Sequence, residues 1–191
     1  MALYHWLRIR AQGRSWAGAY ERLVDSDLGA EVWGAFSGIF GVGSNELLLV
    51  LHGERGPRND TLRAAGFEIV GSHTFVPTVR PVRFQPVRRA GLYVFRFFEV
   101  AHIDIDEIAR LSEEAWTTFE HAGSYAAEPK ALFAEADRSG VDGRMLLVTW
   151  YDDLESWQAS RSPAPEASEN FRRRRDLTRG TVAFATRLVE A

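Results

Sequence analysis

The chain of 191 residues is 46% hydrophobic and 26% charged, which is typical of a globular protein with one domain or two small ones. A net charge of −3 provides no general attraction for nucleic acid or an anionic membrane, and the lack of cysteine excludes disulfides, thiolate metal sites and cysteine nucleophiles. The first residues show no signal-peptide pattern, and the longest apolar run, residues 47–51, is too short to span a bilayer. We therefore expect a cytoplasmic protein without nucleic-acid or membrane partners.

The first half of the chain begins with an alternating segment, residues 3–9, which predicts a strand. Ser15 is expected to cap the helix that follows, and Asp60 a second, shorter helix that ends at Gly66. The predicted elements of this half are, in order, strand 3–9, helix 16–24, strands 33–42 and 46–52, helix 60–65 and strand 67–76.

Prolines at 77, 81 and 86 mark the middle of the chain. Because proline removes a hydrogen-bond donor and stiffens the backbone, we expect a linker at 83–89 between an N-terminal half, 1–82, and a C-terminal half, 90–191. The predicted elements of the second half are strand 91–100, a helix capped by Asp104 with an apolar stripe to Phe119, strands 130–136 and 144–151, helices 153–159 and 166–177, and strand 181–189.

Both halves thus have the order β-α-β-β-α-β, and short stretches repeat between them: residues 2–4 align with 91–93, and 47–50 with 145–148. Such a half covers only one face of its sheet with helices. We therefore predict an α+β fold of two tandem ferredoxin-like halves packed sheet to sheet as a pseudo-dimer. The expected assembly is a monomer with this internal pseudo-dimer, or a homodimer.

The second half resembles the NIPSNAP-type branch of the dimeric α/β-barrel superfamily. The similarity is carried by the segment 147–156, Leu-Val-Thr-Trp-Tyr-Asp-Asp-Leu-Glu-Ser, with Arg161 beyond it. The strand that starts at Tyr93 is similar to that family's opening Tyr-Glu-Leu-Arg-x-Tyr, but departs from it at Val94 and Phe98. Members of the superfamily include cofactor-independent monooxygenases, isomerases, cyclases, haem-handling enzymes and proteins with no assigned reaction, so the resemblance implies a fold more than an activity.

Histidine is the best available base in a chain without cysteine. His52 ends one strand and His73 lies in another, and if both point into a cleft they are candidates for a catalytic acid and base. We expect the strand of His52 to lie at a sheet edge, next to the first strand. The simpler interpretation is structural, as it is for His5; His102 and His121 are expected to be solvated or capping residues.

No histidine or carboxylate spacing matches a metal site, and no cofactor is predicted. Haem is not excluded, and His52, His73 and His121 would be the candidates for its axial ligand. The basic run 172–175 lies beside acidic residues and is expected to be a solvated helix face.

Aromatic and arginine side chains are the strongest indication of a ligand site. Tyr4, Trp6 and Arg8 in the first predicted strand correspond to aromatic positions that include Tyr93 and Phe95 in the second half. A planar ligand could stack on such a face while Arg8 or Arg96 binds a carboxylate, enolate or phenolate. Arg96 has the opposite parity to Phe95, so both line one cavity only if a bulge intervenes. The simpler interpretation is that these side chains form inter-sheet core.

Two functions follow from these observations. In the first, the chain binds a small molecule and acts as a cofactor-independent enzyme of the monooxygenase, isomerase or cyclase type on an aromatic or polyketide-like substrate. In the alternative, it is a non-catalytic ligand-binding or assembly module. A closed cavity in which a histidine or tyrosine faces an arginine would favour the enzyme, and a filled space would favour the module.

Overall fold

A computed structural model describes residues 3–163 and 165–189. The chain divides into two compact units. Their bounds differ from the expected halves, because each unit also contains a short segment that was expected in the other half. The first unit runs to Val76 and also contains Phe84–Ala90 and the segment from Phe184, whereas the second contains Pro77–Arg83 and Gly91–Ala183. The proline-bearing stretch is therefore shared between the units, because residues 84–90 return to the first one, where the Val87 N–H donates to the Trp33 carbonyl at 2.7 Å.

The first unit is an antiparallel sheet in the order β4–β1–β3–β2, extended by the end of β8 beside β2. The third strand therefore lies between β1 and β2, so the expectation that it forms an edge was wrong. The elements are β1 (Leu3–Ala11), α1 (Ala17–Val24), β2 (Glu31–Phe40), β3 (Glu46–Gly53), α2 (Asn59–Ala64) and β4 (Phe67–Arg80), of which residues 67–76 belong to this unit.

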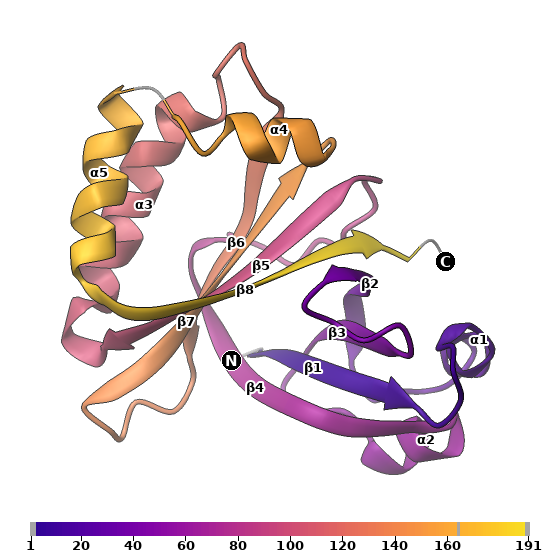
Figure 1. Ribbon diagram of the computed structural model, residues 1–191. Helices are drawn as coiled ribbons and strands as arrows, with labels where there is room; N and C mark the ends of the chain where they lie inside the picture. Colours follow the sequence, from indigo (N-terminus) through magenta and orange to yellow (C-terminus); the bar gives the residue numbers. More distant parts are fainter. Residues whose placement is uncertain (1–2, 164, 190–191) are drawn as a thin grey trace. The chain divides into compact units, whose positions relative to one another are not determined.

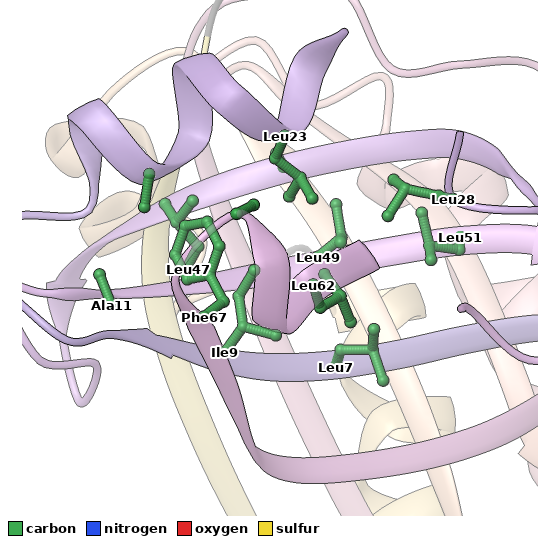
Figure 2. Packing of buried hydrophobic residues seen from close by; sticks show 13 residues of the cluster. Leu7, Ile9, Ala11, Leu23, Leu28, Leu47, Leu49, Leu51, Leu62 and Phe67 are labelled. Carbon is green, nitrogen blue, oxygen red and sulfur yellow. The ribbon is translucent and has the colours of Figure 1, made fainter. Parts of the chain in front are cut away.

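Alternation along β1 and β3 divides this sheet into a helix-facing side and an opposite side. Every second residue of each strand points toward α1 and α2, where aliphatic side chains pack together (Figure 2). Burying each such leucine contributes about 1.5–3 kcal/mol to stability. The largest members of this aliphatic cluster are Leu7, Ile9, Leu23, Leu28, Leu47, Leu49, Leu51, Leu62 and Phe67.

Of the three expected caps, Ser15, Asp60 and Asp104, only Asp104 occupies an N-cap position, at the start of α3 (Ile105–Phe119), and its side chain accepts no capping hydrogen bond there. The Asp153 carboxylate accepts the Ser156 N–H at 2.7 Å and caps α4 (Leu154–Ala159). Ser15 accepts from the Ala17 N–H but lies one residue before the N-cap of α1, and Asp60 lies inside α2, where its charge faces the helix N-terminus.

The second unit repeats the strand order, as β8–β5–β7–β6. Residues 77–80 of β4 also belong to it, and the Thr78 hydroxyl donates to the Leu132 carbonyl at 2.7 Å. Helices α3 and α5 run side by side in Figure 1. The elements are β5 (Leu92–Ala101), a 3-10 turn (His102–Asp104), α3 (Ile105–Phe119), β6 (Ala127–Glu135), β7 (Asp142–Tyr151), α4, α5 (Pro165–Asp176) and β8 (Thr178–Leu188), of which residues 178–183 belong to this unit.

Each unit thus has the β-α-β-β-α-β order and the strand arrangement of a ferredoxin-like α+β fold, as the sequence predicts. The second unit has one helix more than the first, because α5 follows α4 before the last strand. None of the helices described in the two ranges is both long and apolar enough to cross a membrane.

Candidate functional site

A pocket of about 320 Å³ lies within the second unit, between its sheet and its helices. This volume is in the range of small-molecule sites. The aromatic part of its lining comes from Trp116 and Phe119 of α3 and Phe171 of α5. Its polar part has no acidic residue among the described lining residues and consists of Arg96, Thr149, Tyr151, Ser160, Arg161, Ser168, Arg172, Arg174 and Arg175.

The sheet contributes Arg96 from β5 and Thr149 and Tyr151 from β7. These positions share one face because Arg96 pairs with Leu147, and residues two apart on β7 point the same way. Tyr93 and Phe95 have the other parity and do not line the pocket, as the alternation of β5 indicated. No bulge separates them from Arg96, since the register of β5 against β7 is continuous.

Arg174 of α5 is the most deeply placed cation of the pocket, with 7% of its surface exposed. Its guanidinium lies 4.8 Å from the centre of the Phe171 ring and 5.2 Å from that of Phe98. It donates one hydrogen bond, to the Ser112 hydroxyl at 3.2 Å. Burial, together with the positive charge of Arg96, lowers the pKa of Arg174 to about 10, so the side chain is still charged at neutral pH.

The surroundings of Arg96 also lower the pKa of its guanidinium group. Burial lowers its pKa, the like charge of Arg161 acts in the same direction, and only Tyr151 opposes them. Among the described residues, no carboxylate forms an ion pair with Arg96 or Arg174, whereas Arg172 pairs with Glu169 at 2.6 Å. A cation that is buried, as Arg174 is, or partly buried, as Arg96 is, is costly in a protein interior when it has no counter-charge. The pocket is therefore arranged to receive an anion.

The predicted residues Tyr4, Trp6, His52 and His73 lie in the first unit, on the side of its sheet away from the helices. Tyr4 pairs with His52 on β3, with ring centres 4.9 Å apart, and Trp6 pairs with His73 on β4 at 5.6 Å. Burial raises the pKa of Tyr4 to about 12. Because β3 and β4 flank β1, the histidines are about 10 Å apart across the sheet.

Each of the two histidines thus lies beside an aromatic ring, and the fold does not bring the histidines together. His52 also stacks on Phe84 at 4.4 Å, and its Nδ1 lies 3.5 Å from the Glu31 carboxylate. A shared role as acid and base would need a ligand that spans both side chains, and it stays a prediction.

Arg8 is placed with these aromatic residues, and its guanidinium lies 5.5 Å from the centre of the Phe184 ring. It is ion-paired at 2.6 Å with Glu46, a buried carboxylate that also binds Arg10 at 2.9 Å. The anion that Arg8 was expected to take from a ligand is therefore already supplied by the protein.

The remaining histidines bind the backbone or a neighbouring side chain. His121 contacts the Thr117 carbonyl and His102 the Gly140 carbonyl, each at 2.8 Å. His5 is buried, contacts the Thr74 hydroxyl at 3.3 Å, and has its pKa lowered by burial.

Of the site residues predicted from the sequence, only Arg96 lines the pocket, and its other lining residues were missed. Arg174 was missed because the run 172–175 was expected to be solvated. That expectation holds for Arg172 and Arg173, which pair with Glu169 and Glu107. Spacing was the available signal: Ala167, Phe171 and Arg174 follow at intervals of four and three, so Arg174 occupies the apolar face of the helix.

The superfamily resemblance leaves haem open as a cofactor, and a haem iron needs an axial ligand from the protein. The described lining residues include no histidine, methionine or cysteine, and Tyr151 is their single phenol. The pocket therefore does not fit a histidine- or thiolate-ligated haem. Nor do the described residues contain a group of three or more histidines and carboxylates that could hold a metal ion.

Comparison with known proteins identifies relatives by structure alone, since no family model and no curated protein sequence matches the chain. An anthrone oxidase-like protein superposes with a TM-score of 0.63 at 14% identity, over 98% of this chain and 92% of the other. A mutant chlorite dismutase from Candidatus Nitrospira defluvii gives 0.58 at 10% identity, over 98% and 91%.

A third solved structure comes from Listeria monocytogenes 4b F2365 and is described as an uncharacterized ferredoxin fold protein related to antibiotic biosynthesis monooxygenases. It gives a TM-score of 0.55 at 9% identity and covers 100% of this chain and 97% of its own. At such identities the likeness concerns architecture only. The chain therefore has the ferredoxin-like α+β fold found in dimeric α/β-barrel proteins.

Proposed function

We propose that the chain binds a small aromatic molecule bearing an anionic group in the pocket of the second unit. The observation that carries this proposal is the pair Arg96 and Arg174, which line the pocket and have no carboxylate partner among the described residues. Arg174 is buried against the Phe98 and Phe171 rings, and Arg96 is partly buried. A ligand anion would replace the hydration that burial removes, and hydrogen bonds from a guanidinium to an anion are among the strong ones.

The aromatic part of the ligand follows from the remaining lining. Trp116, Phe119 and Phe171 provide flat apolar surface beside the arginines. A ring can stack on these side chains while its acidic substituent reaches the guanidinium groups. The fold relatives described as anthrone oxidase-like and as related to antibiotic biosynthesis monooxygenases support a ligand of this aromatic or polyketide-like kind.

Titration calorimetry with 2-naphthoate tests this proposal, with the uncharged 2-naphthalenemethanol as the matched probe. The wild-type chain is expected to bind the acid and to bind the alcohol at least tenfold more weakly. Arg96→Gln or Arg174→Gln should weaken naphthoate binding by about 10- to 100-fold, the range for one charged hydrogen bond. Arg173→Gln is the control, because Arg173 does not line the pocket and is already neutralised by Glu107. Equal binding of acid and alcohol by a folded wild type would overturn the proposal.

Catalysis is the second candidate function, and Tyr151 favours it. Its phenol lies in the same pocket as Arg96, and both are largely buried. A phenol can exchange a proton with an enolate that a nearby cation stabilises, without any cofactor. Exchange of the α-hydrogens of 2-tetralone in D2O, followed by NMR, tests this role. Tyr151→Phe should slow the exchange while naphthoate still binds; exchange no faster than in buffer would leave the chain a binding module.

We further propose that the two units derive from a duplicated ancestor and that the second belongs to the NIPSNAP-type branch. Equal element order and equal strand order support the duplication. The branch assignment is supported by the segment 147–156, whose Asp153 forms the cap that starts α4. An alignment built from homologues of each unit tests both, since profiles of the two units that fail to detect each other would argue against duplication.

A further inference from the structure

We infer that the ligand of this pocket carries two separate anionic groups, an inner one bound by Arg96 and Arg174 and an outer one bound by Arg161 and Arg175. The inference rests on the proposed function and specifies its ligand class: an aromatic molecule with acidic groups at two ends. It follows from how the five arginines of the lining differ in burial and in partners.

The inner pair is less exposed than the outer one, because Arg174 is buried and Arg96 is partly buried. Arg174 lies between Phe98 and Phe171, and Arg96 lies on the sheet beneath the helices. The charge of each acts on this inner region, since Arg96 contributes to the lowered pKa of Arg174. One carboxylate with two oxygens can accept from both guanidinium groups.

The outer pair is exposed and comes from two different segments. Arg161 follows α4, with its guanidinium 5.9 Å from the centre of the Trp157 ring, and Arg175 lies in the last turn of α5. Both line the pocket, and neither forms an ion pair with a described carboxylate. Because Arg161 and Arg175 are exposed whereas Arg174 is buried, an anion bound at Arg174 leaves them available for a second anion.

Within the run 172–175, two arginines have carboxylate partners and two do not. Arg172 pairs with Glu169 and Asp176, and Arg173 pairs with Glu107. Arg174 and Arg175 have no carboxylate partner among the described residues. They are consecutive, so their side chains leave the helix about 100° apart. One therefore enters the interior of the pocket while the other stays at its exposed part, which separates the two anion positions.

Aromatic surface joins these two positions. Phe119 and Phe171 line the same pocket as both arginine sets. A rigid ring system between two acids would lie on this surface with an acid at each end. A ligand with one acid would use the inner pair and leave the outer pair solvated.

The test compares 2-naphthoate with 2,6-naphthalenedicarboxylate by titration calorimetry on the full chain. The dicarboxylate is expected to bind the wild type about fivefold more tightly, as solvated ion pairs each contribute little. The double variant Arg161→Gln/Arg175→Gln should lose this preference and its salt dependence, yet bind naphthoate as the wild type does. Arg173→Gln should keep both affinities, because Arg173 does not line the pocket and pairs with Glu107.

The outcomes separate the two proposals. Failure of the wild type to bind naphthoate would reject the proposed function itself. Naphthoate binding with equal affinity for the dicarboxylate would reject the two-anion ligand alone, as would a preference that survives in the double variant. Circular dichroism of each variant confirms that the fold is retained, and the exposed positions of Arg161 and Arg175 make these substitutions mild.

Discussion

Equivalent positions of the two units carry leucine in one and arginine in the other. On the first strand of the first unit, Leu7 pairs with Leu49 and is 2% exposed within the aliphatic cluster. On the first strand of the second unit, Arg96 pairs with Leu147 and lines the pocket. The same strand order and the same parity therefore support an aliphatic core in one unit and a charged cavity in the other.

The helices explain how the second unit holds this charge. After its third strand the first unit has only the short α2, and Leu62 of that helix closes the core. The second unit has α4 and then the twelve-residue α5, which brings Arg174 and Phe171 over the sheet. An additional helix can thus turn the covered face of a ferredoxin-like sheet into a binding site.

The largest expected effect comes from placing an arginine in the first unit at Leu7, the position equivalent to Arg96. Leu7→Arg would place a cation inside the aliphatic cluster, whose described members are all apolar. We expect a loss of more than about 3 kcal/mol in the free energy of unfolding, measured by urea denaturation. Leu7→Met, the matched control, should cost less than about 1.5 kcal/mol. Similar losses in the free energy of unfolding for both variants would mean that packing, and not charge, accounts for the difference between the two units at this position.

An intermediate effect is expected at Glu46, which neutralises arginine in the first unit. Burial alone would raise its pKa, but the Gly43 N–H, Arg8 and Arg10 outweigh burial and hold it below the ordinary 4.5. Glu46→Gln should cost about 1–3 kcal/mol at pH 7. Because the folded-state pKa is lowered, this contribution is complete above pH 4.5 and is lost as the pH falls through the folded value.

Stability curves between pH 3 and pH 7 check this sign. The difference between wild type and Glu46→Gln should shrink as the solution becomes more acidic. Glu68→Gln is the control, since the Glu68 side chain is 60% exposed and its ion pair with Arg10 should contribute less than about 1 kcal/mol. A difference that grows toward acid would show that Glu46 is not stabilised as a carboxylate.

The smallest effect on stability is expected when Arg96 of the second unit is replaced by leucine, the residue that the first unit has at the equivalent position. Arg96→Leu removes a cation that lacks a carboxylate partner among the described residues, so the free energy of unfolding should stay within about 1 kcal/mol of wild type or rise. Naphthoate binding should be lost at the same time. A destabilisation above about 3 kcal/mol would indicate that Arg96 is a structural residue, since that is the loss expected on breaking a satisfied buried pair.

Local patterns predicted much of this structure. The order of strands and helices, the cap at Asp153 and the opposite faces of Phe95 and Arg96 all follow from periodicity and end signals, which act over a few residues. The two-residue period of β5 was enough to predict that Arg96 and Phe95 cannot share a cavity without a bulge.

Long-range contacts decided the rest. Nothing near Arg8 in the sequence shows that Glu46 neutralises it, and nothing near Arg174 shows that Phe98 and Ser112 enclose it. Strand and helix type depend on neighbouring residues, whereas the fate of a charge depends on which distant side chains the fold brings within a few ångströms. The sequence by itself therefore determined the elements and their faces, and the tertiary structure decided which arginines remain available to a ligand.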